Sequence, residues 1–227
     1  MFKRLHRFPL PLLLAAALLC PACRGSIHRA VSEGDRDLVA ALLEKDPAAV
    51  SARDRDGRTP LHLAAGFDRP EVVKLLVAYG AEVEAQDRAG RTPLFAAARS
   101  GQVEIAGLLI TAGAAVTARD RQGRTPLHEA AGRGNAASVE LLIQHRAETN
   151  IGDIQGRTAL HEAVASNQVK TVAALLTLGA FVNARDRNGQ TPLDLANQVC
   201  AEREKPKDPC DPEIARLLRL YGGREAP

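Results

Sequence analysis

Thr59-Pro60-Leu61-His62 is the first of five related tetrapeptides that recur along the chain at a fixed interval. The others are Thr92-Pro93-Leu94-Phe95, Thr125-Pro126-Leu127-His128, Thr158-Ala159-Leu160-His161 and Thr191-Pro192-Leu193-Asp194. Each copy begins 33 residues after the preceding one. Such a period indicates stacked supersecondary units, because each unit can bury its apolar face only against its neighbours. The sequence therefore predicts a solenoid, whose function must lie on its surface.

One period, residues 54–86, shows how each unit should fold. Residues 54–58 have the composition of a turn. Thr59 is suited to cap a helix, and Pro60 fits the first helical position, where its missing N–H costs nothing. A second helix is predicted from the apolar spacing that follows, and Gly80 ends it in a left-handed conformation. The unit is therefore a turn, a short helix, a tight connection, a longer helix and an extended return.

In this register the chain resembles the ankyrin repeat family, whose Thr-Pro-Leu-His and terminal Gly-Ala signatures it carries. The resemblance implies an all-α repeat solenoid, an L-shaped stack of helix-turn-helix units with projecting β-hairpin tips. A capping repeat is expected at 24–53, before five repeats and a tail at 224–227. The five repeats are expected at 54–86, 87–119, 120–152, 153–185 and 186–223, the last with a ten-residue insertion.

Two kinds of position test this register. The connection between the two helices carries Asp68, Gly101, Gly134 and Asn167, all of which tolerate the left-handed region. The cap of the second helix is glycine in every repeat except the third, which has Arg146. This irregular junction is interpreted either as a weaker seam or as a surface adapted to a partner.

The first 23 residues have the pattern of a secretory signal peptide. Lys3, Arg4 and Arg7 precede an apolar run of about ten residues, and small residues follow. This run is too short to span a bilayer, which takes roughly 20 residues in a helix. We therefore expect an exported protein, periplasmic or secreted. Lipid attachment at Cys23 is the alternative to simple cleavage, although the residues around it match a bacterial lipobox poorly.

Composition limits the classes of partner. Residues 1–23 hold three basic and no acidic residues, so the rest of the chain has 27 basic and 27 acidic residues. A neutral mature chain gives no global electrostatic case for binding nucleic acid or an anionic membrane. Aromatic residues make up 3% of the chain and Trp is absent, so the core must be built from Ala, Leu and Val.

Candidate catalytic and metal-binding residues are explained by the repeat. His62, His128 and His161 recur at the repeat interval, so they should be spaced along the stack and hydrogen-bond near the capping threonines. The His-Glu pairs at 128 and 161 begin like a zinc-protease motif but lack its second histidine. The sequence contains neither a phosphate-binding glycine loop nor a Gly-x-Ser-x-Gly elbow. We predict no catalytic residue, cofactor or metal, and a protein that is not an enzyme.

Cys200 and Cys210 bracket the insertion in the last repeat. In register with the other repeats, Cys200 falls at the connection between the helices, and the second helix should resume at Glu213. A charged, proline-bearing loop closed at its base favours a disulfide in an exported protein. Closing about ten residues would contribute roughly 2–3 kcal/mol. Free thiols and a zinc site are the alternatives, and zinc lacks a second pair of ligands.

The resemblance implies a protein-binding surface along the hairpin tips and first helices. Two rows of arginines project onto this surface, interleaved with aspartates. The tip row is Arg55, Arg88, Arg121 and Arg187, interrupted by Ile154, and the second row is Arg58, Arg91, Arg124 and Arg157. The rows could grip an acidic partner or pair locally with the aspartates. Phe67 and Ile154 are candidate apolar anchors.

Together these features predict an exported bacterial protein that binds another protein in the periplasm or at the cell surface. We expect a monomer that binds no nucleic acid and does not span a membrane. A lipid-anchored structural module of the cell envelope is the alternative. An enzyme, a toxin-immunity protein and a host-directed factor are more remote alternatives.

Overall fold

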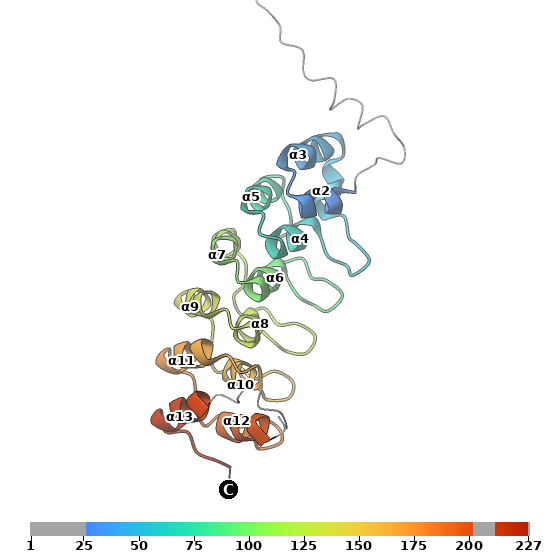
Figure 1. The fold of residues 1–227 in the computed structure, drawn as a ribbon. Coiled ribbons are helices and arrows are strands. Elements are labelled where there is room, and N and C mark those ends of the chain that lie inside the picture. Colours follow the sequence, from blue (N-terminus) through green and yellow to red (C-terminus); the bar gives the residue numbers. More distant parts are fainter. Residues whose placement is uncertain (1–25, 202–211, 227) are drawn as a thin grey trace, which may run out of the picture.

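The computed structural model describes residues 26–201 and 212–226 of the 227-residue chain. Two rows of helices stack side by side, and a loop projects from the inner row between successive units (Figure 1). The inner row contains α2 (Ile27–Glu33), α4 (Pro60–Gly66), α6 (Pro93–Ser100), α8 (Pro126–Arg133), α10 (Ala159–Ala165) and α12 (Pro192–Ala201). The outer row contains α3 (Arg36–Lys45), α5 (Pro70–Ala78), α7 (Val103–Thr111), α9 (Ala136–Gln144), α11 (Val169–Thr177) and α13 (Pro212–Leu220). A short 3₁₀ helix, η2 (Pro47–Ser51), follows α3.

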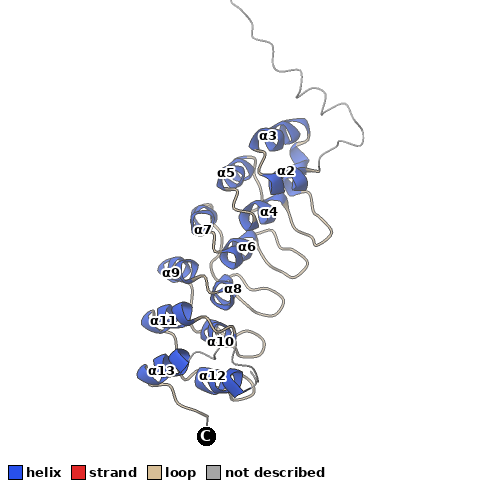
Figure 2. Ribbon diagram, viewed as in Figure 1, coloured by secondary structure: helices blue, strands red, loops and turns tan. Residues whose placement is uncertain are grey.

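This arrangement confirms the predicted all-α solenoid, but the projecting loops are not β-hairpins. No strand occurs in the part of the chain that the structure describes (Figure 2). Successive loops, which we call fingers, are joined by single backbone hydrogen bonds, such as that from Arg121 N–H to the Ala89 carbonyl at 2.9 Å. Within a described finger, the backbone bonds between the two arms only close the tip, such as that from Asp87 N–H to the Arg91 carbonyl at 2.9 Å. The arms form no ladder, so the fingers remain loops.

The core runs the length of the stack and is made of aliphatic side chains, as the composition predicted. The inner helices contribute leucines and alanines at equivalent positions, all at most 1% exposed: Leu61, Leu94, Leu127, Leu160, Ala64, Ala97, Ala130 and Ala163. The outer helices contribute Leu76, Leu109, Leu142 and Leu175, which are fully buried. Alanine on the inner helices permits close packing between neighbouring repeats, which positions the fingers in a regular series.

A buried histidine joins each of three repeats to the next. In the fourth repeat, Thr158 N–H donates to Nδ1 of His161 at 3.2 Å, and Nε2 of the same ring lies 3.2 Å from the Gln190 carbonyl. Since Nδ1 accepts, the ring proton lies on Nε2 and is donated to the carbonyl. His62 and His128 make the same bonds, with the carbonyls of Arg91 and Arg157. The predicted structural role of these histidines is confirmed.

The N-termini of the helices are capped differently in the other two tetrapeptides. Asp194 replaces histidine in the last repeat, and its Oδ2 accepts from both the backbone N–H and the hydroxyl of Thr191, at 2.8 and 2.7 Å. In the second repeat the equivalent residue is Phe95, which is 1% exposed and cannot accept a hydrogen bond. The buried Thr92 hydroxyl therefore makes no hydrogen bond to any described residue.

Left-handed backbone occurs where the sequence placed it. Asp68 and Asn167 have φ values of 56° and 57° at the connection between their helices. Arg146 has a φ of 67° at the cap of α9, where the other repeats have glycine. A residue with a Cβ atom is strained in this conformation, so this position is locally unfavourable.

Several predictions concern residues outside the described part of the chain. The signal peptide, the lipidation candidate Cys23 and Cys210 all lie there. The repeat register predicted that Cys200 lies in the connection between the two helices. It belongs instead to α12, because this helix continues to Ala201. Helix α13 does begin at Pro212, which places Glu213 in its first turn. Within the described residues, none of the helices has both the length and the apolar character that crossing a bilayer needs.

Candidate binding surface

Each finger is shaped by its first aspartate. Oδ1 of Asp87 accepts from the backbone N–H groups of Ala89 and Arg91 at 2.8 and 2.9 Å. Burial alone would raise the pKa of Asp87, but these bonds and the Arg91 guanidinium outweigh burial and lower it. Equivalent backbone bonds are made by Asp54, Asp120, Asp153 and Asp186. These aspartates are therefore occupied in forming the fingers.

The two predicted rows of arginines differ in their pairing. In the second row, Arg58 Nε lies 2.8 Å from Oδ2 of Asp54, and Arg91 Nη2 lies 3.0 Å from Oδ2 of Asp87. Arg124 and Arg157 also contact carboxylates. In the tip row, by contrast, the side chains are exposed and form no ion pair with another described residue: Arg55, Arg88, Arg121 and Arg187. Local pairing thus describes the second row and not the tips.

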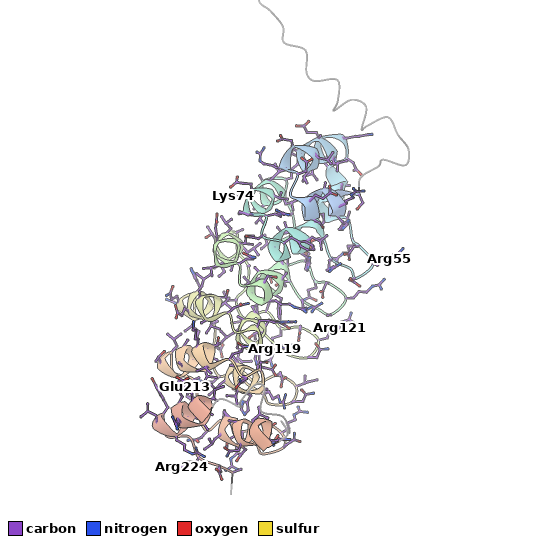
Figure 3. All side chains as sticks on the ribbon, viewed as in Figure 1. Arg55, Lys74, Arg119, Arg121, Glu213 and Arg224 are labelled. Carbon is purple, nitrogen blue, oxygen red and sulfur yellow. The ribbon has the colours of Figure 1, made fainter. Side chains whose placement is uncertain are left out.

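The tip row lies on the same side of the stack as the fingers. Figure 3 shows Arg55 and Arg121 on this side, whereas Lys74 projects from α5 in the outer row. Ile154, which interrupts the row, is 46% exposed. Its backbone N–H donates to the Gln122 carbonyl of the preceding finger at 2.9 Å. The finger is therefore regular here, and only the side chain changes from a cation to an apolar group.

Two adjoining hollows lie between the fingers and the inner helices, and we call them together the groove. The first, the apolar hollow, lies between α4 and α6. Its floor includes Leu63, Gly66, Phe95 and Ala96, and Phe67 stands beside it with 53% of its surface exposed. A Cβ atom added at Gly66 would meet only the Cβ of Ala96, at 3.8 Å. Small residues on two neighbouring helices therefore leave room next to an exposed aromatic ring.

The second, the charged hollow, lies over α6, α8 and α10 and shares Arg91, Arg99 and Glu129 with the first. Arg124 lines this hollow, with Nη1 2.9 Å from Oε1 of Glu129 and Nη2 3.5 Å from Oε2 of Glu162. Burial raises the pKa of Glu162, although Arg124 and Arg157 oppose this. The acidic groups of this hollow are thus both held by Arg124.

Two other arginines at the charged hollow remain without a carboxylate. Arg99 and Arg133 are exposed at the C-terminal ends of α6 and α8, and neither makes an ion pair with a described residue. The charged hollow therefore offers two guanidinium groups for a carboxylate to approach. The Nε of Arg124 is also buried and makes no hydrogen bond to a described residue.

The structure places nine of the ten predicted partner-binding residues in two groups. Phe67, Arg58, Arg91 and Arg124 border the groove, whereas Arg55, Arg88, Arg121, Ile154 and Arg187 lie at the finger tips. The tenth, Arg157, lines neither hollow and contacts Glu162 and Asp186. Arg99, Arg133, Glu129 and Glu162 were not predicted from the sequence. A comparison of equivalent positions would have found the glutamates, because Leu63, Ala96, Glu129 and Glu162 occupy one repeat position and differ in character. It would also have found the arginines, since Arg99 is equivalent to Gly66 and Arg133 to Phe67. The sequence analysis also did not anticipate the exposed Phe181 and Leu220.

The described residues contain no cluster of three or more His, Cys, Asp or Glu side chains that could hold a metal ion. What the groove offers instead is a mixed surface, with an apolar hollow next to unpaired cations. Surfaces of this kind bind through a buried apolar contact supported by charged groups at its edge.

Comparison with known proteins supports the architecture independently. A family model described as ankyrin repeats (3 copies) matches residues 27–120 and 109–186. Among solved structures, an ankyrin repeat domain from Acinetobacter baumannii is similar, with 30% sequence identity and a TM-score of 0.72. The match covers 88% of this chain and 99% of that chain. The residues that the family model matches include every helix that forms the groove.

Proposed function

Because this chain belongs to the ankyrin repeat family, whose repeats generally mediate protein–protein interaction, we propose that it binds another protein without catalysing a reaction. Its sequence adds a location to this proposal. The basic and apolar pattern of residues 1–23 favours export, so the partner would be periplasmic or at the cell surface.

The groove is the observation that carries the proposal. Phe67 is exposed beside an apolar hollow, while Arg99 and Arg133 are unpaired among the described residues. Apolar area and unpaired cations both gain from contact with a partner, and here they adjoin in one hollowed surface. The outer helix α5, in contrast, presents an exposed ion pair between Lys74 and Glu71.

Photo-cross-linking in the producing cells tests the proposal. A photoreactive residue at Phe67 or at Arg121 should give a discrete protein adduct, because these positions flank the groove and a finger tip. The same residue at Glu140, which is exposed on α9, is the matched control and should give none. Adducts at neither position, or equal adducts from Glu140, would contradict binding through the finger side.

The proposed location has a separate test. Mass spectrometry of the mature protein should find an N-terminus at or just after Cys23, and cell fractionation should place the protein outside the cytoplasm. A diacylglycerol-sized mass increase at Cys23 would favour the lipid-anchored module instead. Recovery of the chain from the cytoplasm with residues 1–23 intact would refute export while leaving protein binding untouched.

A further inference from the structure

We propose that the groove binds an extended acidic segment of the partner, in which a bulky apolar residue lies three positions from an aspartate or glutamate. This inference rests on the proposed function and specifies the chemistry of the partner. It follows from the order of the two hollows along the stack and from the charges around the second one.

The apolar hollow fits the bulky side chain. Leu63, Phe95 and Ala96 give this hollow an apolar floor, with charged residues such as Arg91 and Glu129 also lining it. The exposed ring of Phe67 can close over a side chain inserted onto this floor. Gly66 leaves this space open, because it has no side chain and its nearest neighbour beyond the helix is the Ala96 methyl group. An aliphatic or aromatic group inserted here would remove both its own surface and that of Phe67 from water.

The charged hollow fits the carboxylate. Glu129 and Glu162 are already held by Arg124, so a second acidic group can be matched by Arg99 and Arg133. Guanidinium groups bind carboxylates through short, charge-assisted hydrogen bonds. A lysine or arginine of the partner would instead meet these two cations, and their repulsion selects against basic segments.

The distance between the hollows sets the spacing of the two residues. The first hollow lies between α4 and α6, and the two unpaired arginines of the second, Arg99 and Arg133, lie at the ends of α6 and α8. The midpoint of these arginines is therefore one helix position along the stack from the first hollow. Packed helices lie roughly 8–10 Å apart. An extended chain rises about 3.3 Å per residue, so three residues cover this distance. A helical partner, rising about 1.5 Å per residue, would need about five to seven residues to cover the same distance.

Four variants of the chain separate the two hollows from the rest of the surface. Gly66→Gln fills the apolar hollow, and Gly107→Gln is its control, because Gly107 lies in α7 with no atom within 4 Å of an added Cβ. Arg99→Glu reverses a charge in the second hollow, and Lys170→Glu makes the same change of sign on the exposed surface of α11. None of these positions has a left-handed backbone, so all four variants should fold.

Selection from a phage-displayed library of random 12-residue peptides supplies the probe. Peptides enriched on the wild-type chain should carry the apolar and acidic residues at the stated spacing, in either chain direction. Synthetic copies should bind Gly66→Gln and Arg99→Glu at least about tenfold more weakly, and both control variants within about twofold, as expected for loss of a central contact.

Three results would overturn the inference. They are enrichment of peptides without this pattern, equal binding to Gly66→Gln and Gly107→Gln, and enrichment of no peptide. If the Phe67 cross-link still gives a protein adduct, only the inferred partner chemistry fails and the proposed function stands. If neither experiment yields a partner, both fail.

Discussion

The seam between repeats and the groove beside it differ in how far their side chains are buried and bonded. In the seam, His161 is fully buried and bonded on both ring nitrogens, and an equivalent histidine recurs in two other repeats. In the groove, Phe67 and Arg99 are exposed and do not recur at equivalent positions, and Arg99 makes no ion pair with a described residue. Burial therefore separates the two regions: buried polar side chains hold the stack together, whereas exposed and unpaired ones remain available for recognition.

Removal of a core side chain should have the largest effect on the seam. Leu109 is fully buried in α7, so Leu109→Ala leaves a cavity between neighbouring repeats. We expect the free energy of unfolding to fall by about 2–5 kcal/mol. Urea unfolding monitored by circular dichroism measures this change. A loss below about 1 kcal/mol would mean that the repeats do not stack as described.

Removal of a bridging histidine should have the next largest effect. His161→Ala leaves the Thr158 N–H and the Gln190 carbonyl without their partner, which should cost about 1–3 kcal/mol. His161→Asn is the informative control, because its amide oxygen can accept from Thr158 as Asp194 does from Thr191. It should recover part of the loss. Equal losses of unfolding free energy in His161→Ala and His161→Asn would show that the hydrogen bond from Thr158 contributes nothing to stability.

Acid should weaken the same seam. Burial lowers the pKa values of His62, His128 and His161, opposed by their bonds to carbonyls. Below a pH of about 6.5 these histidines therefore bind more protons in the unfolded chain than in the folded chain. The unfolding free energy should fall as the pH decreases from 7.5 to 5.5. The raised pKa of Glu162 acts in the opposite direction but involves one group. Urea midpoints measured over this pH range should decrease less in His161→Asn than in wild type. The same dependence on pH in both proteins would contradict the role of His161 as a buried bridge between repeats.

A smaller, stabilising change is expected at the irregular cap of α9. Arg146 has a φ of 67°, a conformation that costs a residue with a Cβ atom about 1–2 kcal/mol. Arg146→Gly should remove this strain and raise the unfolding free energy by up to about 1 kcal/mol, since glycine also loses more entropy on folding. Gly113→Arg, at the equivalent position of α7, should show the reverse change. Destabilisation by Arg146→Gly would mean that this side chain has a structural partner.

The smallest effect on stability should come from the groove. Arg99 is exposed and unpaired among the described residues, so Arg99→Glu should change the unfolding free energy by less than about 0.5 kcal/mol. Thermal unfolding compared with Lys170→Glu measures this difference. A loss above about 1 kcal/mol would show that Arg99 belongs to the scaffold.

The fold was largely predictable because its determinants are local and repeated. A capping threonine, a proline after it and a residue that tolerates a positive φ each specify one feature, and 33-residue spacing specifies their stacking. The β-hairpins were wrongly predicted, because pairing between the two arms of a finger depends on how the loop lies in space, and the backbone bonds of the described fingers only close their tips. The register of Cys200 was also wrong, since helix α12 continues past the point where α6 and α8 end.

The site was less predictable because it depends on contacts between repeats. Arg124 was assigned to a row of arginines facing aspartates, but it contacts Glu129 of its own repeat and Glu162 of the next. Arg99 and Arg133 can bind a carboxylate of a partner because Glu129 and Glu162 are already paired with Arg124. Such a balance of partners requires side-chain positions, which a repeat pattern does not provide.

Unfolding free energy and peptide affinity, measured together on His161→Ala and Arg99→Glu, test the division between seam and groove most directly. The account predicts opposite outcomes: His161→Ala is destabilised yet binds a selected peptide like wild type below its unfolding transition, whereas Arg99→Glu is as stable as wild type and binds at least about tenfold more weakly. Parallel losses of stability and affinity in both variants would contradict it.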